Sequence, residues 1–267
     1  MKRAEVKGKL PVSAMIVGYN ESHFLPACLD SVSFCEEIVY IDLGSTDSSI
    51  SIAEKYVTSV RKINKVPSGE YAQSEVVKEL KNDWVIFIDP DEVIDKTLQQ
   101  EIQQNFEFYT TQPQLGAVIV SWIFYFKNRK LQGTIWGGVN EKILLVNRNR
   151  FLFLPITHHG RKLIEGYTSL SISFKETNCL HHYWMRSYLI FLKKHLRYLK
   201  KEGVDQYNMG RRIALKSIVF TPYKHFWECF YKKKGFKDGL LGFNLSVFWA
   251  IYQSVIVFKI LKLQLRN

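Results

Sequence analysis

The chain has few cysteines and lacks the common nucleotide-binding loops. Its four cysteines among 267 residues form no Cys-x-x-Cys pair and no regular spacing, which argues against a disulfide framework and indicates a reducing compartment. Neither Gly-x-Gly-x-x-Gly nor a Walker loop occurs, which disfavours ordinary dinucleotide enzymes and P-loop NTPases. Residues 1–9 are polar and charged, so we expect no signal peptide.

Acidic residues are scarce in the C-terminal third. Between residues 186 and 237, fourteen Lys and Arg stand against three Asp and Glu, within a chain of net charge +12. A basic region with many aromatic residues indicates an anionic partner, such as membrane lipid, an anionic glycan or nucleic acid. No nucleic-acid recognition motif accompanies it, so we expect no nucleic-acid partner.

The clearest functional signal is an apolar run that ends in acids. Residues 84–88 (WVIFI) are β-branched and aromatic, which predicts a strand buried on both faces. Asp89, Asp91 and Glu92 follow around Pro90. Carboxylates crowded at the carboxyl end of a strand suit Mg²⁺ or Mn²⁺, which usually bridges to substrate phosphates. The alternative is an acidic turn before a helix, where the helix dipole favours acids.

Strands alternate with helices through the first hundred residues. A second buried strand also ends in an acid, Asp42. This alternation predicts an α/β fold with a mostly parallel mixed sheet flanked by helices. Strands are expected at 12–19, 37–42, 58–63 and 84–88, and helices at 22–32, 47–57, 69–80 and 95–108, with Ser22 and Asp47 as N-caps.

The second half of the chain changes character. Strands are expected at 116–126, 142–147, 151–155 and 170–174, and helices at 188–199, 210–220 and 222–234. The pairs His158-His159 and His181-His182 lie in or beside predicted loops, and Gly203 is expected to end a helix. Residues 240–258 carry no charge and reach the lower end of membrane-spanning length. We favour an in-plane or docked helix, because polar residues and a small-residue face interrupt this segment.

Four stretches resemble the motifs of family 2 glycosyltransferases, in order and at matching separations. They are residues 12–21 (VSAMIVGYNE), 28–32 (CLDSV), 37–47 (with EIVYID and GSTD) and 83–92 (DWVIFIDPDE). The lipopolysaccharide-core glucosyltransferase-like subgroup of Gram-negative bacteria is the most similar, and the chain shares its helical, basic tail. The resemblance implies a GT-A (Rossmann-like) fold, a nucleotide-sugar donor and Mg²⁺ or Mn²⁺.

The resemblance also implies roles for particular residues. The donor site would be formed around Asp42, which would contact a nucleobase, typically uracil. Asp89 and Asp91 would hold the ribose and the metal–diphosphate, and His181 or His182 could reach the metal. The nucleotide-sugar-binding residues implied are Tyr19, Asn20, Glu21, Asp42, Ser45 and Asp89, to which we add Trp136 as a ring that could stack on a sugar.

An inverting transfer needs a base on the acceptor side, and the candidates are His158, His159 and Glu165, with Glu141 behind them. The subgroup carries a His-Glu pair where this chain has His158-His159, so a histidine replaces the glutamate. The usual Arg-Leu-Phe triplet resembles residues 142–144 or a neighbouring stretch.

We therefore predict a transferase domain at 1–183 (donor half 1–110, acceptor half 111–183) and a helical, basic, membrane-associating region at 184–267. The predicted function is inverting, metal-dependent hexosyl transfer from a UDP-sugar such as UDP-glucose to a cell-envelope glycan or lipopolysaccharide-core acceptor. The place would be the cytoplasmic face of the bacterial inner membrane, with pairing of chains through the C-terminal helix left open. The alternative is a degenerate homologue that binds nucleotide-sugar or membrane without turnover.

Overall fold

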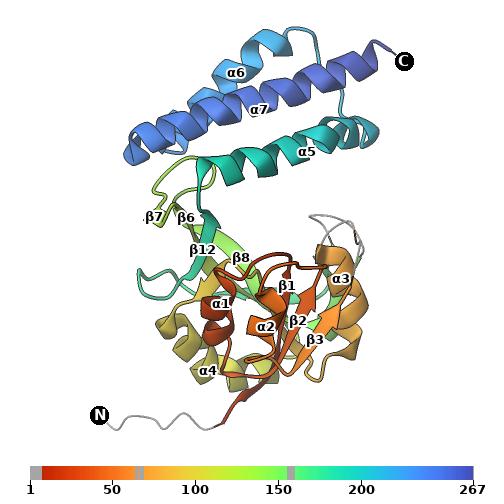
Figure 1. Cartoon of the computed structure of the whole chain (residues 1–267), viewed down its shortest axis with the longest axis vertical. Coiled ribbons are helices and arrows are strands. Elements are labelled where there is room, and N and C mark those ends of the chain that lie inside the picture. Colours follow the sequence, from red (N-terminus) through yellow and green to blue (C-terminus); the bar gives the residue numbers. More distant parts are fainter. Residues whose placement is uncertain (1–7, 64–65, 67–68, 155–159, 267) are drawn as a thin grey trace. The chain divides into compact units, whose positions relative to one another are not determined.

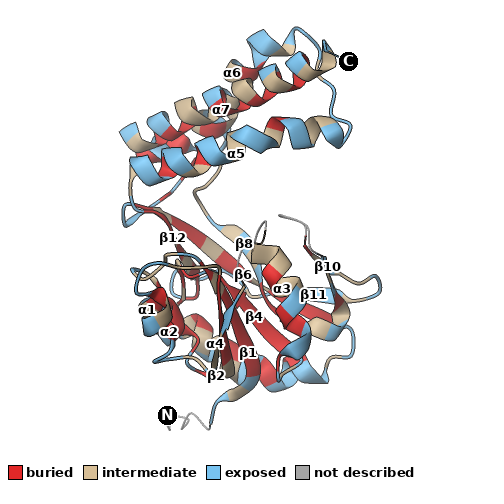
Figure 2. Ribbon diagram, turned by 45° about the vertical axis from the view of Figure 1, so that its right-hand side comes forward, coloured by how far each residue is buried: buried red, intermediate tan, exposed pale blue. Residues whose placement is uncertain are grey.

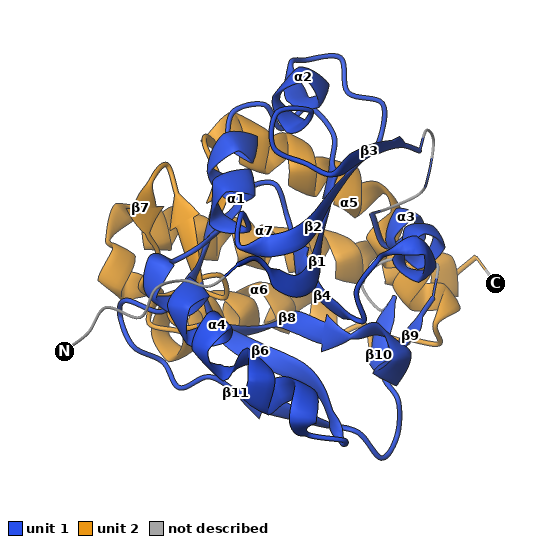
Figure 3. Cartoon of the chain, turned by 90° about the horizontal axis from the view of Figure 1, so that it is seen from below, with its two compact units in different colours: residues 1–122, 140–182 blue, residues 123–139, 183–267 orange. Residues whose placement is uncertain are grey.

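The computed structural model describes residues 8–63, 66, 69–154 and 160–266. The chain divides into two compact units, which Figure 3 colours separately. The first unit contains residues 1–122 and 140–182, and the second contains 123–139 and 183–267. We call them the sheet unit and the helical unit.

The described elements of the sheet unit follow the predicted alternation closely (Figure 1). Its strands are β1 (Leu10–Gly18), β2 (Cys35–Asp42), β3 (Ser59–Lys62), β4 (Trp84–Ile88), β5 (Glu92–Ile94), β8 (Asn140–Asn147), β9 (Phe151–Phe153), β10 (Arg161–Leu163) and β11 (Thr168–Ser171). Its helices are α1 (Leu25–Ser31), α2 (Ser49–Ala53), α3 (Gly69–Val76) and α4 (Lys96–Thr111). Two strands, β6 (Leu115–Phe126) and β12 (Leu180–Met185), begin in this unit and end in the other.

The main sheet is mixed, with the order β3-β2-β1-β4-β8-β6-β12-β5. Strands β3, β2, β1 and β4 are parallel to their neighbours, whereas β8 is antiparallel to both β4 and β6. Helices connect the parallel strands, as a right-handed crossover requires. The expected fold class, a mixed sheet flanked by helices with a helical C-terminal extension, is confirmed.

Figure 2 shows the central strands as largely buried (red), and alternate residues of these strands face two different cores. Ala14 and Ile16 of β1 pack with α1 and α4, whereas Met15 packs with α3 and β9. Because both faces are covered, β4 is buried at all five positions. This double burial explains why the sequence of β4 is uniformly apolar.

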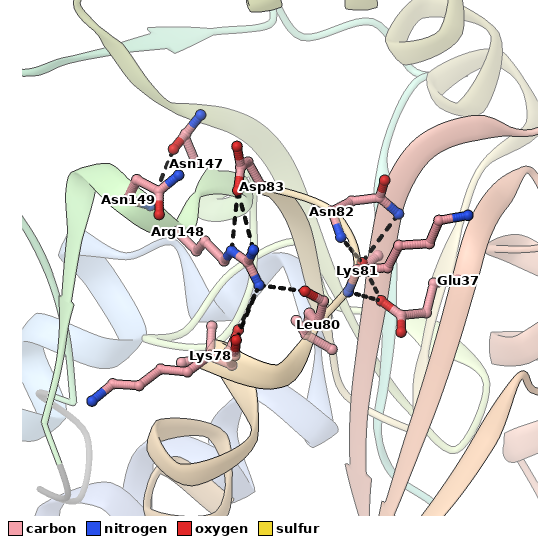
Figure 4. A network of polar contacts seen from close by, with 11 residues as sticks. Glu37, Lys78, Leu80, Lys81, Asn82, Asp83, Asn147, Arg148 and Asn149 are labelled. Carbon is pink, nitrogen blue, oxygen red and sulfur yellow. Dashed lines mark hydrogen bonds and ion pairs between the residues drawn. The ribbon is translucent and has the colours of Figure 1, made fainter.

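The beginning of β4 is fixed by a polar network around Asp83 and Arg148 (Figure 4). Arg148 Nε donates to Asp83 Oδ1 at 3.2 Å, and its Nη1 donates to the carbonyl of Leu80 at 2.5 Å. The backbone N–H of Lys81 donates to Glu37 Oε2 at 2.8 Å. These contacts fix the residues just before β4 against the neighbouring elements. They thereby help to position the opposite end of the strand.

The helical unit consists of three long helices and a hairpin. The helices are α5 (Tyr188–Asn208), α6 (Ser217–Trp227) and α7 (Leu240–Gln264), and a π-helical turn (Glu228–Lys232) extends α6. Helix α7 packs on α5 and α6 and buries a stripe that runs along its whole length, from Gly242 to Leu261. Among the described residues, α7 is the one helix that is long and apolar enough to cross a membrane, and 44% of its most apolar 18-residue stretch is buried.

Several local predictions were wrong, each for a tertiary reason. Gly203 does not end α5, because the glycine lets α5 approach α7: a Cβ there would lie 2.9 Å from Lys259 Cβ. Residues 211–216 are not helical, and α6 runs through Pro222. His181 and His182 lie in strand β12 rather than in a loop. The N-caps of α1 and α2 are Phe24 and Ser48.

Candidate active site

The acidic motif lies between two strands, at the carboxyl end of β4 and the beginning of β5. Strand β5 pairs with β12, which sets His182 opposite Glu92. Strand β8 pairs antiparallel with β4, with Ile86 opposite Leu145. Three residues further along β4 and three back along β8, this register sets Asp89 opposite Lys142. Strands from three parts of the chain therefore converge on the motif.

Lys142 makes a buried ion pair with two of the three carboxylates. Its Nζ lies 2.5 Å from Glu92 Oε2 and 3.3 Å from Asp89 Oδ2. The Glu92 side chain is fully buried and that of Lys142 is 10% exposed, whereas that of Asp89 is 53% exposed. Glu92 Oε2 also accepts from the backbone N–H of Asp89 at 2.8 Å. Glu92 thus anchors the lysine from inside, and Asp89 faces outward.

These charges shift the pKa values of the motif in opposite directions. Burial raises the pKa of the Glu92 carboxyl, although Lys142 partly offsets it. Burial would also raise the pKa of Asp89, but the positive charges of Lys142, His182 and Arg161 outweigh it and lower that pKa to about 2. Burial lowers the pKa of Lys142, and the two carboxylates more than compensate, so it is raised. Asp89 is therefore an anion, and Lys142 a cation, at neutral pH.

Asp91 faces a histidine and an aromatic ring. His182 Nε2 lies 3.3 Å from Asp91 Oδ2. The His182 ring stacks on Trp122, with centroids 5.0 Å apart and planes 5° apart, and the Lys142 ammonium lies 5.2 Å from the Trp122 ring centroid. His181, the neighbouring histidine of the pair, instead lies 3.3 Å from Asp95. The strand period of two directs the two histidines to opposite sides.

The donor set suits a hard divalent cation. Among the described residues, no three His, Cys, Asp or Glu side chains converge as a complete metal cluster. Asp89 and Asp91 nevertheless offer partly exposed carboxylate oxygens at one strand end. Mg²⁺ and Mn²⁺ commonly take one or two carboxylates and fill the remaining positions with phosphate oxygens and water. The residues present fit such an ion.

A second group of polar residues follows β1 and β2, in the loop at 42–47 and at Asn20. Asp42 is 1% exposed, and its carboxylate accepts the backbone N–H groups of Gly44 at 2.9 Å and Ser45 at 3.0 Å. Asn20, at a φ of 55°, accepts the N–H of Thr46 at 2.8 Å and donates its own N–H to Ser45 Oγ at 2.9 Å. The buried carboxylate of Asp42 therefore stabilises the conformation of this loop.

The two loops are close because Gly18 lacks a side chain. A Cβ at Gly18 would lie 2.6 Å from the Tyr40 hydroxyl and 3.0 Å from Pro90 Cγ. Beneath the acidic motif, the thiol of Cys28 donates to the carbonyl of Asp89 at 3.3 Å. These two contacts pack the backbone of the motif against the end of β1 and against α1.

The remaining predicted site residues fall in different places. Trp136 lies in the helical unit, where its ring packs on Trp184 at 4.9 Å and on Trp249 at 5.7 Å, so it belongs to an aromatic core rather than to an open loop. Glu165 is exposed in the turn between β10 and β11. His158 and His159 lie outside the described residues.

Sequence reasoning missed Lys142 as a partner of the motif. The signal available was register: a lysine that opens a strand antiparallel to the acid-ended strand lies opposite the acids. That register requires knowing that β8 neighbours β4, which no local pattern shows. Three predicted residues follow β1, namely Tyr19 (54% exposed), Asn20 and Glu21, and Ser45 follows β2. Their role in binding a nucleotide-sugar stays a prediction.

Comparisons with known proteins identify the family. The model of glycosyl transferase family 2 matches residues 13–164, more than half of the chain. The chain is 26% identical over 262 residues to lipopolysaccharide core biosynthesis glycosyltransferase LpsC of Rhizobium meliloti, covering 94% of this chain and 92% of that protein. It is 24% identical to an uncharacterized glycosyltransferase of Rickettsia conorii, covering 96% and 92%.

Among solved structures, glucosyl-3-phosphoglycerate synthase of Mycobacterium tuberculosis, in complex with Mn²⁺, UDP and glucosyl-3-phosphoglycerate, is 19% identical. The match covers 43% of this chain and 44% of that one, with a TM-score of 0.34. The family match covers both acid-ended strands, β2 and β4, and the lysine strand β8. The chain belongs to glycosyl transferase family 2 and is a glycosyltransferase.

Proposed function

We propose that this glycosyltransferase moves a hexose from a UDP-sugar to a lipopolysaccharide-core or related envelope glycan, with inversion and with Mg²⁺ or Mn²⁺. The observation that supports the proposal is the acidic motif at the end of β4, where Asp89 and Asp91 present partly exposed carboxylate oxygens. The acceptor class is supported by similarity along nearly the whole chain to a lipopolysaccharide-core transferase.

Different loops of this chain would bind different parts of the nucleotide-sugar donor. The 42–47 loop, held by Asp42, and the 19–21 loop, held by Asn20, form the side where the nucleoside would bind. Asp89 and Asp91 would bind the cation that neutralises the leaving diphosphate. His182 orients Asp91 from behind, and Trp122 keeps water from that face. The donor would thus be fixed before an acceptor arrives.

Inversion requires the acceptor hydroxyl to attack opposite the diphosphate while a base takes its proton. We propose His158, His159 or Glu165 as that base, because these residues lie in or beside the segment between β9 and β11. A neutral imidazole is an effective base near pH 7. Replacing each with Gln or Asn should lower the rate of transfer by about 10²–10⁴-fold only at the true base.

Donor binding tests the proposal first. Thermal shift of the whole chain should be measured with UDP-, GDP- and dTDP-sugars, with and without Mn²⁺, for the wild type and for Asp91→Asn. We expect stabilisation by UDP-sugars that needs Mn²⁺ and is lost in Asp91→Asn. Lys81→Gln, an exposed cation at the other end of β4, is the matched control and should bind like the wild type.

Transfer to lipopolysaccharide-core oligosaccharide then separates an active enzyme from a degenerate one. An inverting transferase converts an α-linked UDP-sugar into a β-linked product, which the anomeric proton coupling in NMR reports. Donor binding without any product would favour the degenerate alternative. Failure of every nucleotide-sugar to bind would refute the proposal itself.

We also propose that the exposed face of α6 binds the chain to an anionic membrane surface. Apolar and aromatic side chains are exposed at every fourth position of α6 and the turn that extends it. They are Val219 (61% exposed), Tyr223 (73%), Trp227 (55%) and Tyr231 (47%). Lys224 and Lys232 lie among them along one surface groove, and three more lysines follow at 233, 234 and 237. Aromatic side chains beside lysines suit the interface of an anionic bilayer.

Vesicle sedimentation distinguishes this surface from others. Tyr223→Ser/Trp227→Ser should lose binding to vesicles of phosphatidylglycerol and phosphatidylcholine, whereas Phe108→Ser, which removes a 50% exposed ring from α4, should not. Wild-type binding should weaken in pure phosphatidylcholine and in high salt. If the double variant instead abolishes a dimer seen by light scattering and leaves vesicle binding intact, the surface pairs two copies and the membrane proposal is wrong.

A further inference from the structure

Lys142 is a feature that a metal-binding acidic motif does not by itself require. Its ammonium is shared between Glu92 and Asp89, at 2.5 Å and 3.3 Å. Asp89 is also one of the two carboxylates proposed to bind the metal. One carboxylate thus has two competing cations, one supplied by the chain and one by solution.

The burial of the three carboxylates separates their roles. Glu92 is fully buried, and Lys142 is the one Lys or Arg within ion-pair distance of it in the described part of the chain. Separating that pair would leave a buried charge without a counter-ion, which is strongly unfavourable. Asp89 is half exposed and holds Lys142 by the longer contact. Asp89 can therefore exchange its partner, whereas Glu92 cannot.

We propose that Lys142 is a resident counter-ion which a divalent metal must displace from Asp89, so that the metal binds weakly until a nucleotide diphosphate joins it. The proposal rests on the proposed function, because it takes Asp89 and Asp91 as the metal-binding pair. Its consequence is an order of events: nucleotide and metal enter together, and the empty protein does not retain the metal.

The charges give the reason for this order. Three carboxylates, the Lys142 ammonium and the nearby Arg161 guanidinium leave one negative charge, and the ammonium already lies 3.3 Å from an oxygen of Asp89. Two cations about 5 Å apart in protein surroundings repel enough to change an affinity by about tenfold or more. A diphosphate brings negative charge to the same place and reverses the balance. Lys142, still held by Glu92, then lies beside the diphosphate as a second cation.

Titration with Mn²⁺, with free Mn²⁺ counted by its EPR signal, tests the inference without any turnover. The wild type should bind Mn²⁺ weakly alone and much more tightly with UDP. Lys142→Gln should bind Mn²⁺ alone about tenfold more tightly or better, and the enhancement by UDP should shrink. Lys142→Arg, which keeps the charge, and Lys175→Gln, which removes an exposed lysine paired with Glu101, should behave like the wild type.

A double variant controls for loss of folding in Lys142→Gln, which leaves Glu92 buried without its counter-ion. Glu92→Gln/Lys142→Gln removes both buried charges, so no ion is left unpaired, and Mn²⁺ alone should still bind several-fold more tightly than in the wild type. If neither variant binds Mn²⁺ more tightly, the competition by Lys142 is refuted. If Asp91→Asn retains wild-type binding of Mn²⁺ with UDP, the metal site of the proposed function is wrong, and that result is distinct from the first.

Discussion

The two units use charge in opposite ways. In the sheet unit, buried acids make structural contacts: Asp42 accepts two backbone N–H groups, and Glu92 pairs with Lys142. In the helical unit, the interior is aromatic, and none of the described lysines is buried. The comparison shows that a buried cation, Lys142, stabilises part of the sheet unit, whereas the described lysines of the helical unit are partly or fully exposed.

One feature is shared, and it sharpens the contrast. Asp238 of the helical unit is fully buried and accepts the N–H groups of Gln132 at 2.9 Å and Gly133 at 2.7 Å. Asp238 stabilises the hairpin loop through these hydrogen bonds, as Asp42 stabilises the 42–47 loop. A buried carboxylate that accepts backbone N–H groups therefore stabilises a loop in both units, and the sheet unit also has an acidic motif whose Asp89 faces outward.

The largest effect is expected from breaking the buried ion pair of the sheet unit. Lys142→Met leaves Glu92 buried without its counter-ion and should lower the free energy of unfolding by about 3–5 kcal/mol. Denaturant titration measures this, and Glu92→Gln/Lys142→Met should recover much of the loss. A Lys142→Met protein as stable as the wild type would mean that the pair contributes nothing to stability.

The helical unit should respond nearly as strongly to loss of its buried acid. Asp238→Ala removes the acceptor of two backbone N–H groups and should cost about 3 kcal/mol. Hydrogen exchange followed by mass spectrometry should show faster exchange at residues 131–138, with the β1–β4 peptides unchanged. Equal acceleration in both units would show that they unfold as one.

A methyl group at Gly18 should strain the sheet unit locally. Gly18→Ala places a Cβ 2.6 Å from the Tyr40 hydroxyl and should cost about 1–3 kcal/mol. Tyr40→Phe/Gly18→Ala removes the clashing oxygen and should restore part of the loss, measured by thermal unfolding. Gly69→Ala, where an added Cβ would lie at an ordinary contact distance of 3.5 Å from Val17 Cγ1, controls for a general effect of added side chains.

Acid should weaken the sheet unit through Asp89. The pKa of Asp89 is about 2 in the folded protein, below about 3.9 in an unfolded chain. The stabilisation is therefore complete above the unfolded value and is lost as the pH falls from about 4 to about 2. Asp89→Asn should flatten this part of the curve of stability against pH, because the variant has no carboxyl to protonate.

The smallest effect on stability should come from the exposed face of α6. Trp227→Ser removes a side chain that is 55% exposed and should change the free energy of unfolding by no more than about 0.5 kcal/mol. The same substitution should weaken vesicle binding. A large loss of stability would show that Trp227 packs inside the helical unit instead of facing a partner.

The sheet unit was predictable because its signals are local. Each of β1, β2 and β4 is a short apolar run that ends in polar residues, and Asp95 does cap α4 by accepting the N–H of Thr97 at 2.9 Å. The acids at the ends of β2 and β4 were visible for the same reason. Strand β5 was missed because three residues, Glu92–Ile94, carry no pattern of their own until β12 pairs with them.

The contents of the site depended on long-range pairing. Whether His181 or His182 faces Asp91 is decided by the register of β12, and Lys142 reaches Asp89 through the antiparallel pairing of β8 with β4. Trp136 lies in a glycine-rich stretch that suggests an open loop, yet its ring packs on Trp184 and Trp249. Composition cannot distinguish these outcomes, because they follow from which strands and helices become neighbours.

The stripe on α7 also determines how the protein behaves in dilute buffer. Several of its side chains are buried inside the helical unit, whereas Ile251 and Phe258 of the same helix are 58% and 60% exposed. The lysines of the same unit keep separate molecules apart by repulsion, which salt screens within about 10 Å at 0.1 M. Raising the ionic strength should therefore lower solubility, and mild detergent should restore it.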